Sequence, residues 1–165
     1  MSISPDLATS LTAIGSIMDG ATDPWWIIGS AAVALHGADP DSVGDVDVLL
    51  SVADARRIFP TIGIELRRGS AHALFRSSIF GRWTETALPV EFMADFYRHS
   101  GTAWVPVRPT TRQAVELDGT MVFIPEQAEM ETMLAKFGRP KDIERARRLA
   151  TQAERHSGNR IVFGK

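Results

Sequence analysis

The sequence predicts a mixed α/β protein of the α+β class, in which a short mixed sheet is flanked by helices. Helical and strand-like patterns are mixed along the 165 residues without the strict alternation of a parallel α/β fold. Hydrophobic residues make up 44% and charged residues 23% of the chain, which is typical of a globular domain with its own core. Cysteine is absent, which excludes disulfide frameworks, cysteine zinc sites and thiol nucleophiles.

The first helix is expected over residues 5–19. Ser4 is a typical N-cap, Pro5 suits the first helical position, and apolar residues then recur every three or four positions. The apolar run 25–28 predicts a short buried strand after this helix.

The next segment predicts a turn, a helix and a second strand. Gly29-Ser30 follows the first strand at once, and the alanine-rich run 31–36 favours a helix directly after the turn. A polar loop over 37–44 leads into an apolar strand over 45–50.

The middle of the chain contains a short helix and several strands. Ser51 is expected to cap a helix that ends before Pro60. Runs rich in apolar and aromatic residues then predict strands over residues 73–83, 87–92, 104–107 and 120–124.

From Pro125 onward the pattern is helical. Gly138 is a plausible C-cap of one helix, and Pro140 can open the last one. We therefore expect residues 1–124 to form the core and residues 125–165 to form a helical C-terminal segment of the same domain.

The net charge of −2 is unevenly distributed. Residues 136–165 hold nine Lys/Arg and three Asp/Glu, whereas residues 1–135 hold nine and seventeen. We expect the basic segment to be a solvated helix face, with a surface for phosphates, RNA or an acidic partner as the alternative. No apolar run approaches the ~20 residues of a membrane span, and the N-terminus shows no signal-peptide pattern. A cytoplasmic protein without a membrane partner is therefore expected.

Three acidic residues could hold a metal ion. Asp45 and Asp47 alternate along an expected strand, so both carboxylates project to one face and repel each other. A hard divalent cation relieves such repulsion, and Mg²⁺ is usually held by one or two carboxylates together with substrate phosphates. Glu91 lies at the centre of another expected strand and is the third candidate. Asp95 is the alternative candidate for the third carboxylate. The alternative is that all are solvated strand residues.

Gly29-Ser30 could bind an anion. The pair lies between a strand and a helix, where backbone N–H groups are unpaired, and serine adds a hydroxyl donor. The alternative is a plain tight turn with serine as the helix cap. Fourteen residues separate this turn from Asp45.

These features together resemble the DNA polymerase β-like nucleotidyltransferase superfamily: a strand ending in Gly29-Ser30, a helix, an apolar-flanked Asp45-x-Asp47 and a later Glu91. The resemblance covers roughly residues 23–150. Its closing part, which includes Lys136, is similar to that of small prokaryotic members such as antibiotic-modifying and abortive-infection-type toxin enzymes.

The sequence departs from this pattern at two points. The loop over residues 39–44 is acidic, whereas many relatives carry Arg and Ser or Thr before the Asp-x-Asp pair. The third carboxylate is Glu91 rather than the more common Asp.

The resemblance implies the nucleotidyltransferase fold and a metal-dependent transfer of NMP from an NTP to an acceptor hydroxyl. It implies two Mg²⁺ ions, and its metal-binding and catalytic residues would be Asp45, Asp47 and Glu91. Its nucleotide-binding residues would be Gly29, Ser30 and Lys136. A structural role beside Phe137 is the alternative for Lys136.

Several alternatives stay open at this point. The chain could be a non-catalytic nucleotide- or partner-binding member of the same fold, of the toxin–antitoxin type. A glycosyltransferase that uses Asp-x-Asp for metal and nucleotide sugar is a third hypothesis, but it leaves Gly29-Ser30 unexplained. The acceptor could be a small molecule, a protein or a tRNA end. The NTP could be ATP, GTP, CTP or UTP. A homodimer or an antitoxin partner is also compatible with the sequence.

Overall fold

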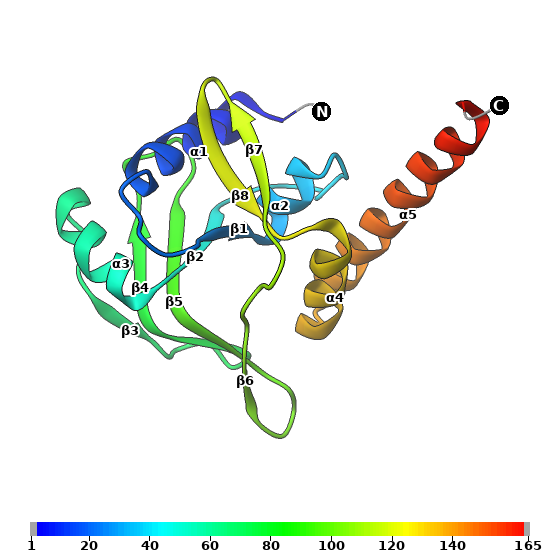
Figure 1. The fold of residues 1–165 in the computed structure, drawn as a ribbon. Coiled ribbons are helices and arrows are strands. Elements are labelled where there is room, and N and C mark those ends of the chain that lie inside the picture. The colour runs from blue at the N-terminus through cyan, green and yellow to red at the C-terminus, as the bar shows by residue number, and fades with distance from the viewer. Residues whose placement is uncertain (1–2, 164–165) are drawn as a thin grey trace.

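The computed structural model describes residues 3–163, with side chains through residue 155. Its α-helices are α1 (Pro5–Met18), α2 (Gly29–Leu35), α3 (Val52–Ile58), α4 (Gln127–Phe137) and α5 (Pro140–Phe163), with a 3₁₀ turn at Phe59–Ile62. Its strands are β1 (Trp26–Ile28), β2 (Val46–Leu50), β3 (Arg67–Gly69), β4 (Phe75–Trp83), β5 (Val90–His99), β6 (Trp104–Pro106), β7 (Gln113–Leu117) and β8 (Thr120–Ile124). Figure 1 shows the larger sheet beside its helices.

The main sheet is mixed, as expected for the predicted fold class. Its strands follow the order β1-β2-β5-β4-β3, and β6 pairs with the far end of β5. β2 and β5 run parallel, whereas the remaining pairs in this sheet are antiparallel. β7 and β8 form a separate hairpin, which packs against α1 and β1. The sheet therefore places β2 and β5 side by side at its centre.

The predicted helix boundaries are confirmed by their caps. The Ser4 hydroxyl accepts a hydrogen bond from the Leu7 N–H, and the Ser51 hydroxyl accepts one from the Asp54 N–H. Gly138 ends α4 with a φ of 76°, in the left-handed region where glycine is favoured. One boundary differs from the prediction, because α2 begins at Gly29 itself rather than after the turn.

Three strands differ from the sequence expectation. β5 continues to His99, beyond the predicted end at residue 92, because polar residues interrupt its apolar pattern. β3 and β7 were not expected at all, since both are short and largely exposed and therefore lack an apolar signal. β3 forms through its pairing with β4, and β7 forms through its pairing with β8.

The core lies between the sheet and the helices that cover it. β2 contributes Val46 and Val48, both fully buried, and β5 contributes Phe92. Trp25 packs edge-on against Phe123 with ring centroids 5.4 Å apart, so the hairpin is joined to the start of β1. α4 and α5 pack against each other and against α2, and α5 extends away from the sheet (Figure 1). The division at residue 124 stays a prediction.

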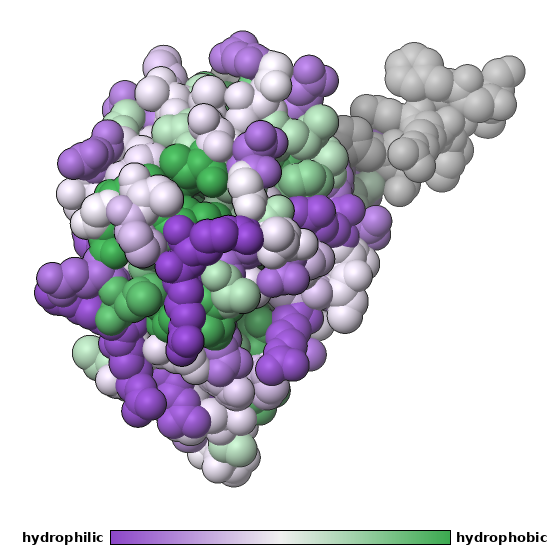
Figure 2. Space-filling model, turned by 60° about the vertical axis from the view of Figure 1, so that its left-hand side comes forward, coloured by the Kyte–Doolittle hydropathy of each residue, from purple (hydrophilic) through white to green (hydrophobic). Residues whose placement is uncertain are grey.

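Few large apolar side chains are strongly exposed among those that the structure describes. They are Leu66, Met121 and Ile143, between 45% and 49% accessible and from separate parts of the chain. Figure 2 shows apolar surface on one face, interrupted by long hydrophilic side chains. Among residues 3–163, no helix combines the length and apolar character needed to cross a membrane.

Asp54 fixes α3 to the segment before β1. Its fully buried carboxylate accepts hydrogen bonds from the Thr22 and Asp23 N–H groups, each at 3.0 Å, and from Arg57. Burial acts to raise the pKa of Asp54, but these hydrogen bonds outweigh it and hold the pKa below its usual value.

Replacing Asp54 by Ala is expected to lower the free energy of unfolding by about 3 kcal/mol, because the Thr22 and Asp23 N–H groups and Arg57 lose a buried charged acceptor. Urea denaturation measures this loss. Asp54→Asn keeps one acceptor oxygen and should recover part of it. An Asp54→Ala variant as stable as the wild type would contradict this role.

Candidate metal and nucleotide site

Strand register brings the three predicted carboxylates together. β2 pairs in parallel with β5 so that Asp47 lies opposite Glu91, and Asp45 immediately precedes β2. One carboxylate oxygen from each of the three residues lies within 4.8 Å of the others. Among the described residues, this is the one group of three acidic or histidine side chains so arranged. We call Asp45, Asp47 and Glu91 the carboxylate cluster.

The cluster carries negative charge that the protein only partly compensates. Burial, followed by the charges of Asp45 and Glu91, raises the pKa of Asp47 to about 7. Arg139 and Lys141 oppose this rise. The pKa of Glu91 is also raised, first by burial and then by Asp45, although Arg82 donates to its carboxylate at 3.0 Å.

Gly29 lies directly against the cluster. Ile28, the last residue of β1, pairs with Asp47, so the turn that follows passes the Asp47 carboxylate. Gly29 has a φ of 69°, and a Cβ at this position would lie 2.9 Å from Asp47 Oδ2. Both the backbone conformation and the close approach therefore require glycine.

Replacing Gly29 by Ala is expected to destabilise the protein by about 1–3 kcal/mol, since Ala is strained at this φ and displaces Asp47. Thermal unfolding and NTP binding measure the two effects. Gly44→Ala is the matched control, because Gly44 lines the same cavity and a Cβ there meets nothing within 4 Å. Equal effects of the two substitutions would contradict the special role of Gly29.

The cluster opens into a cavity of about 650 Å³. Gly29 and Ser30 line this cavity together with the cluster. Its cationic side chains are Arg68, Arg76, Arg139, Lys141 and Arg145. Its aromatic wall consists of Phe75, Phe80, Phe96 and Phe137. Acidic, cationic and apolar side chains therefore meet in one space, a combination that suits a nucleoside triphosphate with its metal ion.

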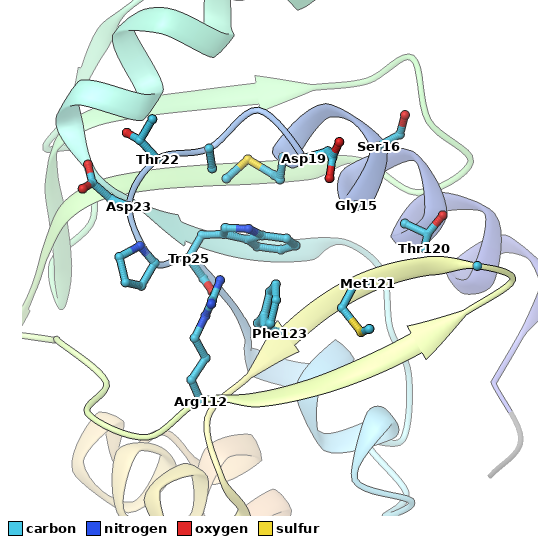
Figure 3. A pocket seen from close by; sticks show the side chains of 14 residues that line it. Gly15, Ser16, Asp19, Thr22, Asp23, Trp25, Arg112, Thr120, Met121 and Phe123 are labelled. Carbon is cyan, nitrogen blue, oxygen red and sulfur yellow. The ribbon is translucent and has the colours of Figure 1, made fainter.

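A second cavity, of about 660 Å³, lies between α1 and the β7–β8 hairpin (Figure 3). Trp25 and Phe123 form its apolar wall, and Arg112 Cζ lies 3.4 Å from the centroid of the Phe123 ring. Its described lining includes Asp19 and Asp23 but none of the predicted site residues. The cavity at the carboxylate cluster is therefore the candidate site.

The acidic loop before Asp45 does not direct its charges at this cavity. The Asp41 carboxylate accepts a hydrogen bond from Arg148 of α5 at 2.7 Å, and Asp39 lies 3.7 Å from the same guanidinium. Arg145 donates to the backbone carbonyl oxygen of Pro40 and also lines the cavity. The basic segment thus neutralises the loop, and α5 supplies a cation on this side of the site.

Two other sequence candidates lie away from the cluster. Lys136 is exposed on α4 and lines a separate depression beside Arg98, because its position in the last helical turn faces β6 rather than β2. Lys136 is not among the residues that line the cavity at the carboxylate cluster, whereas Lys141 is, and a nucleotide contact by Lys136 stays a prediction. Asp95 accepts a hydrogen bond from Ser78 and lies 3.7 Å from Arg108, so Glu91 is the third acidic residue.

Asp142 has the structural role that its position indicates. Its buried carboxylate, in the first turn of α5, accepts hydrogen bonds from the backbone and side-chain nitrogens of Arg139. The pair closes the junction between α4 and α5. The sequence analysis does not identify three cationic residues of α5. Lys141 and Arg145 line the cavity and Arg148 contacts the loop before Asp45, because α5 packs beside that loop in the folded chain.

The chain matches no protein-family model and no curated protein. Its fold, however, is that of nucleotidyltransferases. A candidate nucleotidyltransferase from Thermotoga maritima superposes with a TM-score of 0.70 at 22% identity, covering 92% of this chain and 96% of that one. The antibiotic-resistance factor ANT(2'')-Ia gives a TM-score of 0.57 at 15% identity, covering 94% and 90%. The lincosamide antibiotic adenylyltransferase LnuA gives 0.57 at 7% identity, covering 92% and 99%.

Proposed function

We propose that this protein transfers a nucleoside monophosphate from an NTP to an acceptor hydroxyl. The observation that carries the proposal is the carboxylate cluster held against the Gly29 turn, inside a fold shared with nucleotidyltransferases. Two of the structural neighbours are antibiotic-modifying proteins, one of them an adenylyltransferase, which favours a small-molecule acceptor. A homodimer or an antitoxin partner stays a prediction.

The cluster fits divalent metal ions. Carboxylate oxygens are the hard ligands that Mg²⁺ prefers, and three of them lie within 4.8 Å of one another. Burial and mutual repulsion raise the pKa of Asp47, so a cation would relieve a real electrostatic cost. When bound, Mg²⁺ ions would neutralise charge on the reacting phosphate and on the pyrophosphate that leaves. Asp45 and Asp47 would hold two ions, and Glu91 would complete the site of one.

The other cavity residues would position the NTP. The Gly29 N–H and the Ser30 hydroxyl would bind the terminal phosphates beside Asp47. Lys141 would contact the same phosphates, because it lines the cavity and already acts on Asp47. Where Glu91 is not occupied as a ligand, it would accept the proton of the attacking hydroxyl.

Calorimetric titration of each NTP, with and without Mg²⁺, tests this proposal. We expect binding of at least one NTP that requires Mg²⁺ and that is lost when Asp45 and Asp47 are both replaced by Ala. Asp95→Asn is the control, because Asp95 lies outside the cluster. A folded wild type that binds no NTP under these conditions would contradict the proposal and favour a partner-binding role.

The acidic loop before Asp45 and the short length of the chain are what favour the non-catalytic alternative. In the structure the carboxylates of that loop contact Arg148 instead of pointing at the nucleotide cavity. The loop therefore does not oppose triphosphate binding, and the hypothesis of an active nucleotidyltransferase is better supported than that of a non-catalytic member of the same fold.

A further inference from the structure

The cavity extends across the sheet in a defined direction. The carboxylate cluster lies on the two central strands, β2 and β5. On one side is the Gly29 turn, which follows the edge strand β1, together with the start of α5. On the other side are β4 and the opposite edge strand β3. A ligand at the Gly29 turn and a ligand at β3–β4 would therefore lie on opposite sides of the cluster.

Cationic residues line both ends of this cavity. Lys141 belongs to the end near Asp47, since it acts on the pKa of that carboxyl. Arg139 is paired with Asp142, and its Cζ lies 5.0 Å from the centroid of the Phe75 ring of β4. Arg68 of β3 and Arg76 of β4 belong to the other end. A triphosphate placed against Gly29 lies near Lys141 and leaves Arg68 and Arg76 without an assigned function.

Arg68 and Arg76 also lack a counterion in the protein. Among the described residues neither has a carboxylate within salt-bridge distance, whereas the neighbouring Arg67 is paired with Glu65. Arg76 lies over the ring of Trp104, with Cζ 4.4 Å from the centroid, which holds its guanidinium in place. Two arginine residues that line one end of a cavity, without carboxylate partners among the described residues, favour an anionic ligand.

We propose that the acceptor is a phosphate-bearing molecule, whose phosphate is bound by Arg68 and Arg76 and whose hydroxyl reaches the carboxylate cluster. This inference rests on the proposed nucleotidyl transfer. The hydroxyl oxygen forms a bond to the α-phosphorus of the NTP, and the bond from that phosphorus to the bridging oxygen of pyrophosphate breaks. The hydroxyl proton passes to Glu91 or, where Glu91 is occupied as a metal ligand, to solvent. The aromatic side chains of Phe75 and Phe80 would line the space beside the acceptor.

An acceptor that carries both a phosphate and a free hydroxyl could be a small phosphorylated molecule or the end of an RNA chain. The proposed site excludes a polycationic acceptor, because two guanidinium groups would repel it. Three probes separate these cases: cytidine 5′-monophosphate, a short single-stranded RNA with a free 3′ hydroxyl, and tobramycin as the polycation.

The test measures binding of each probe to protein saturated with Mg²⁺ and a non-hydrolysable analogue of the NTP that binds most tightly. We expect cytidine 5′-monophosphate or the RNA to bind, and tobramycin not to bind. Replacing Arg68 and Arg76 together by Ala should weaken phosphate-probe binding about tenfold or more, since charge-assisted contacts are lost. Arg67→Ala removes the same charge next to Arg68 but outside the cavity, and should change it less than about twofold.

Binding of tobramycin with no binding of either phosphate probe would overturn the inference while leaving nucleotidyl transfer intact. Failure of both phosphate probes to bind, or binding that the double substitution leaves unchanged, would overturn it as well. Binding of the NTP analogue is measured first on every variant, so loss of the nucleotide site itself would be seen separately. Preference for the RNA or for the monophosphate would identify the source of the phosphate.

Discussion

Replacing Asp47 by Asn should abolish nucleotidyl transfer and at the same time make the metal-free protein more stable. We expect transfer to fall roughly a thousandfold or more, because the substitution removes one of the proposed metal ligands next to the Gly29 turn. Stability rises because the substitution removes a partly buried charge that Asp45 and Glu91 repel. Pyrophosphate release and urea denaturation in the presence of EDTA measure the two effects.

Asp95→Asn is the matched control for this prediction. It removes one carboxylate from the same sheet but outside the cluster, and its φ of 56° is one that Asn tolerates. Neither pyrophosphate release nor stability should change by more than a small factor. An Asp47→Asn protein that is both inactive and strongly destabilised would indicate a structural role for Asp47 instead.

The stability of the metal-free protein should fall as pH rises from about 4 to about 7. The folded protein holds a proton on Asp47, whose pKa is raised from 3.8 to about 7, whereas the unfolded chain has already lost it. The folded state therefore binds more protons in this window, and deprotonation costs it on the order of 2–4 kcal/mol. The proposed Mg²⁺ site requires deprotonated carboxylates, so the stabilisation that Mg²⁺ provides should be larger at about pH 8 than at about pH 5.

Thermal unfolding with and without Mg²⁺ at both pH values measures this effect. For a chain of this size we expect Mg²⁺ to raise the Tm by roughly 5 °C or more at the higher pH. Other carboxylates also titrate, so the decisive quantity is the difference between the wild type and Asp47→Asn. A wild-type protein and a variant with the same pH dependence and the same response to Mg²⁺ would contradict the assigned pKa.

Local patterns were sufficient to predict the centre of the candidate site. The alternation of Asp45 and Asp47 on an apolar strand predicts two carboxylates on one face, and the structure brings Glu91 beside Asp47 through the parallel pairing of β2 and β5. Gly29 was identified as part of a turn, and its close approach to Asp47 explains why glycine occupies it. The carboxylate cluster and the Gly29 turn could be predicted because they depend on residues close together in the sequence and on the single pairing of β2 with β5.

The cationic parts of the site could not be predicted in the same way. Lys141 and Arg145 reach the cavity only because α5 packs against α2 and the loop before β2, which lie about a hundred residues earlier in the chain. Helical spacing indicates which faces of α5 are polar but not what they contact. Lys136 was chosen by resemblance, and the orientation of α4 turns it toward β6.

The most direct test of the metal–nucleotide site is a crystal structure with Mn²⁺ in place of Mg²⁺ and a non-hydrolysable NTP analogue. Anomalous scattering would locate the metal ions without ambiguity. We predict two ions about 3.5–4 Å apart, bound by Asp45 and Asp47 with Glu91 on one of them, and the triphosphate against Gly29. Nucleotide bound in the cavity beside Trp25, or bound at the cluster without any metal ion, would contradict the account.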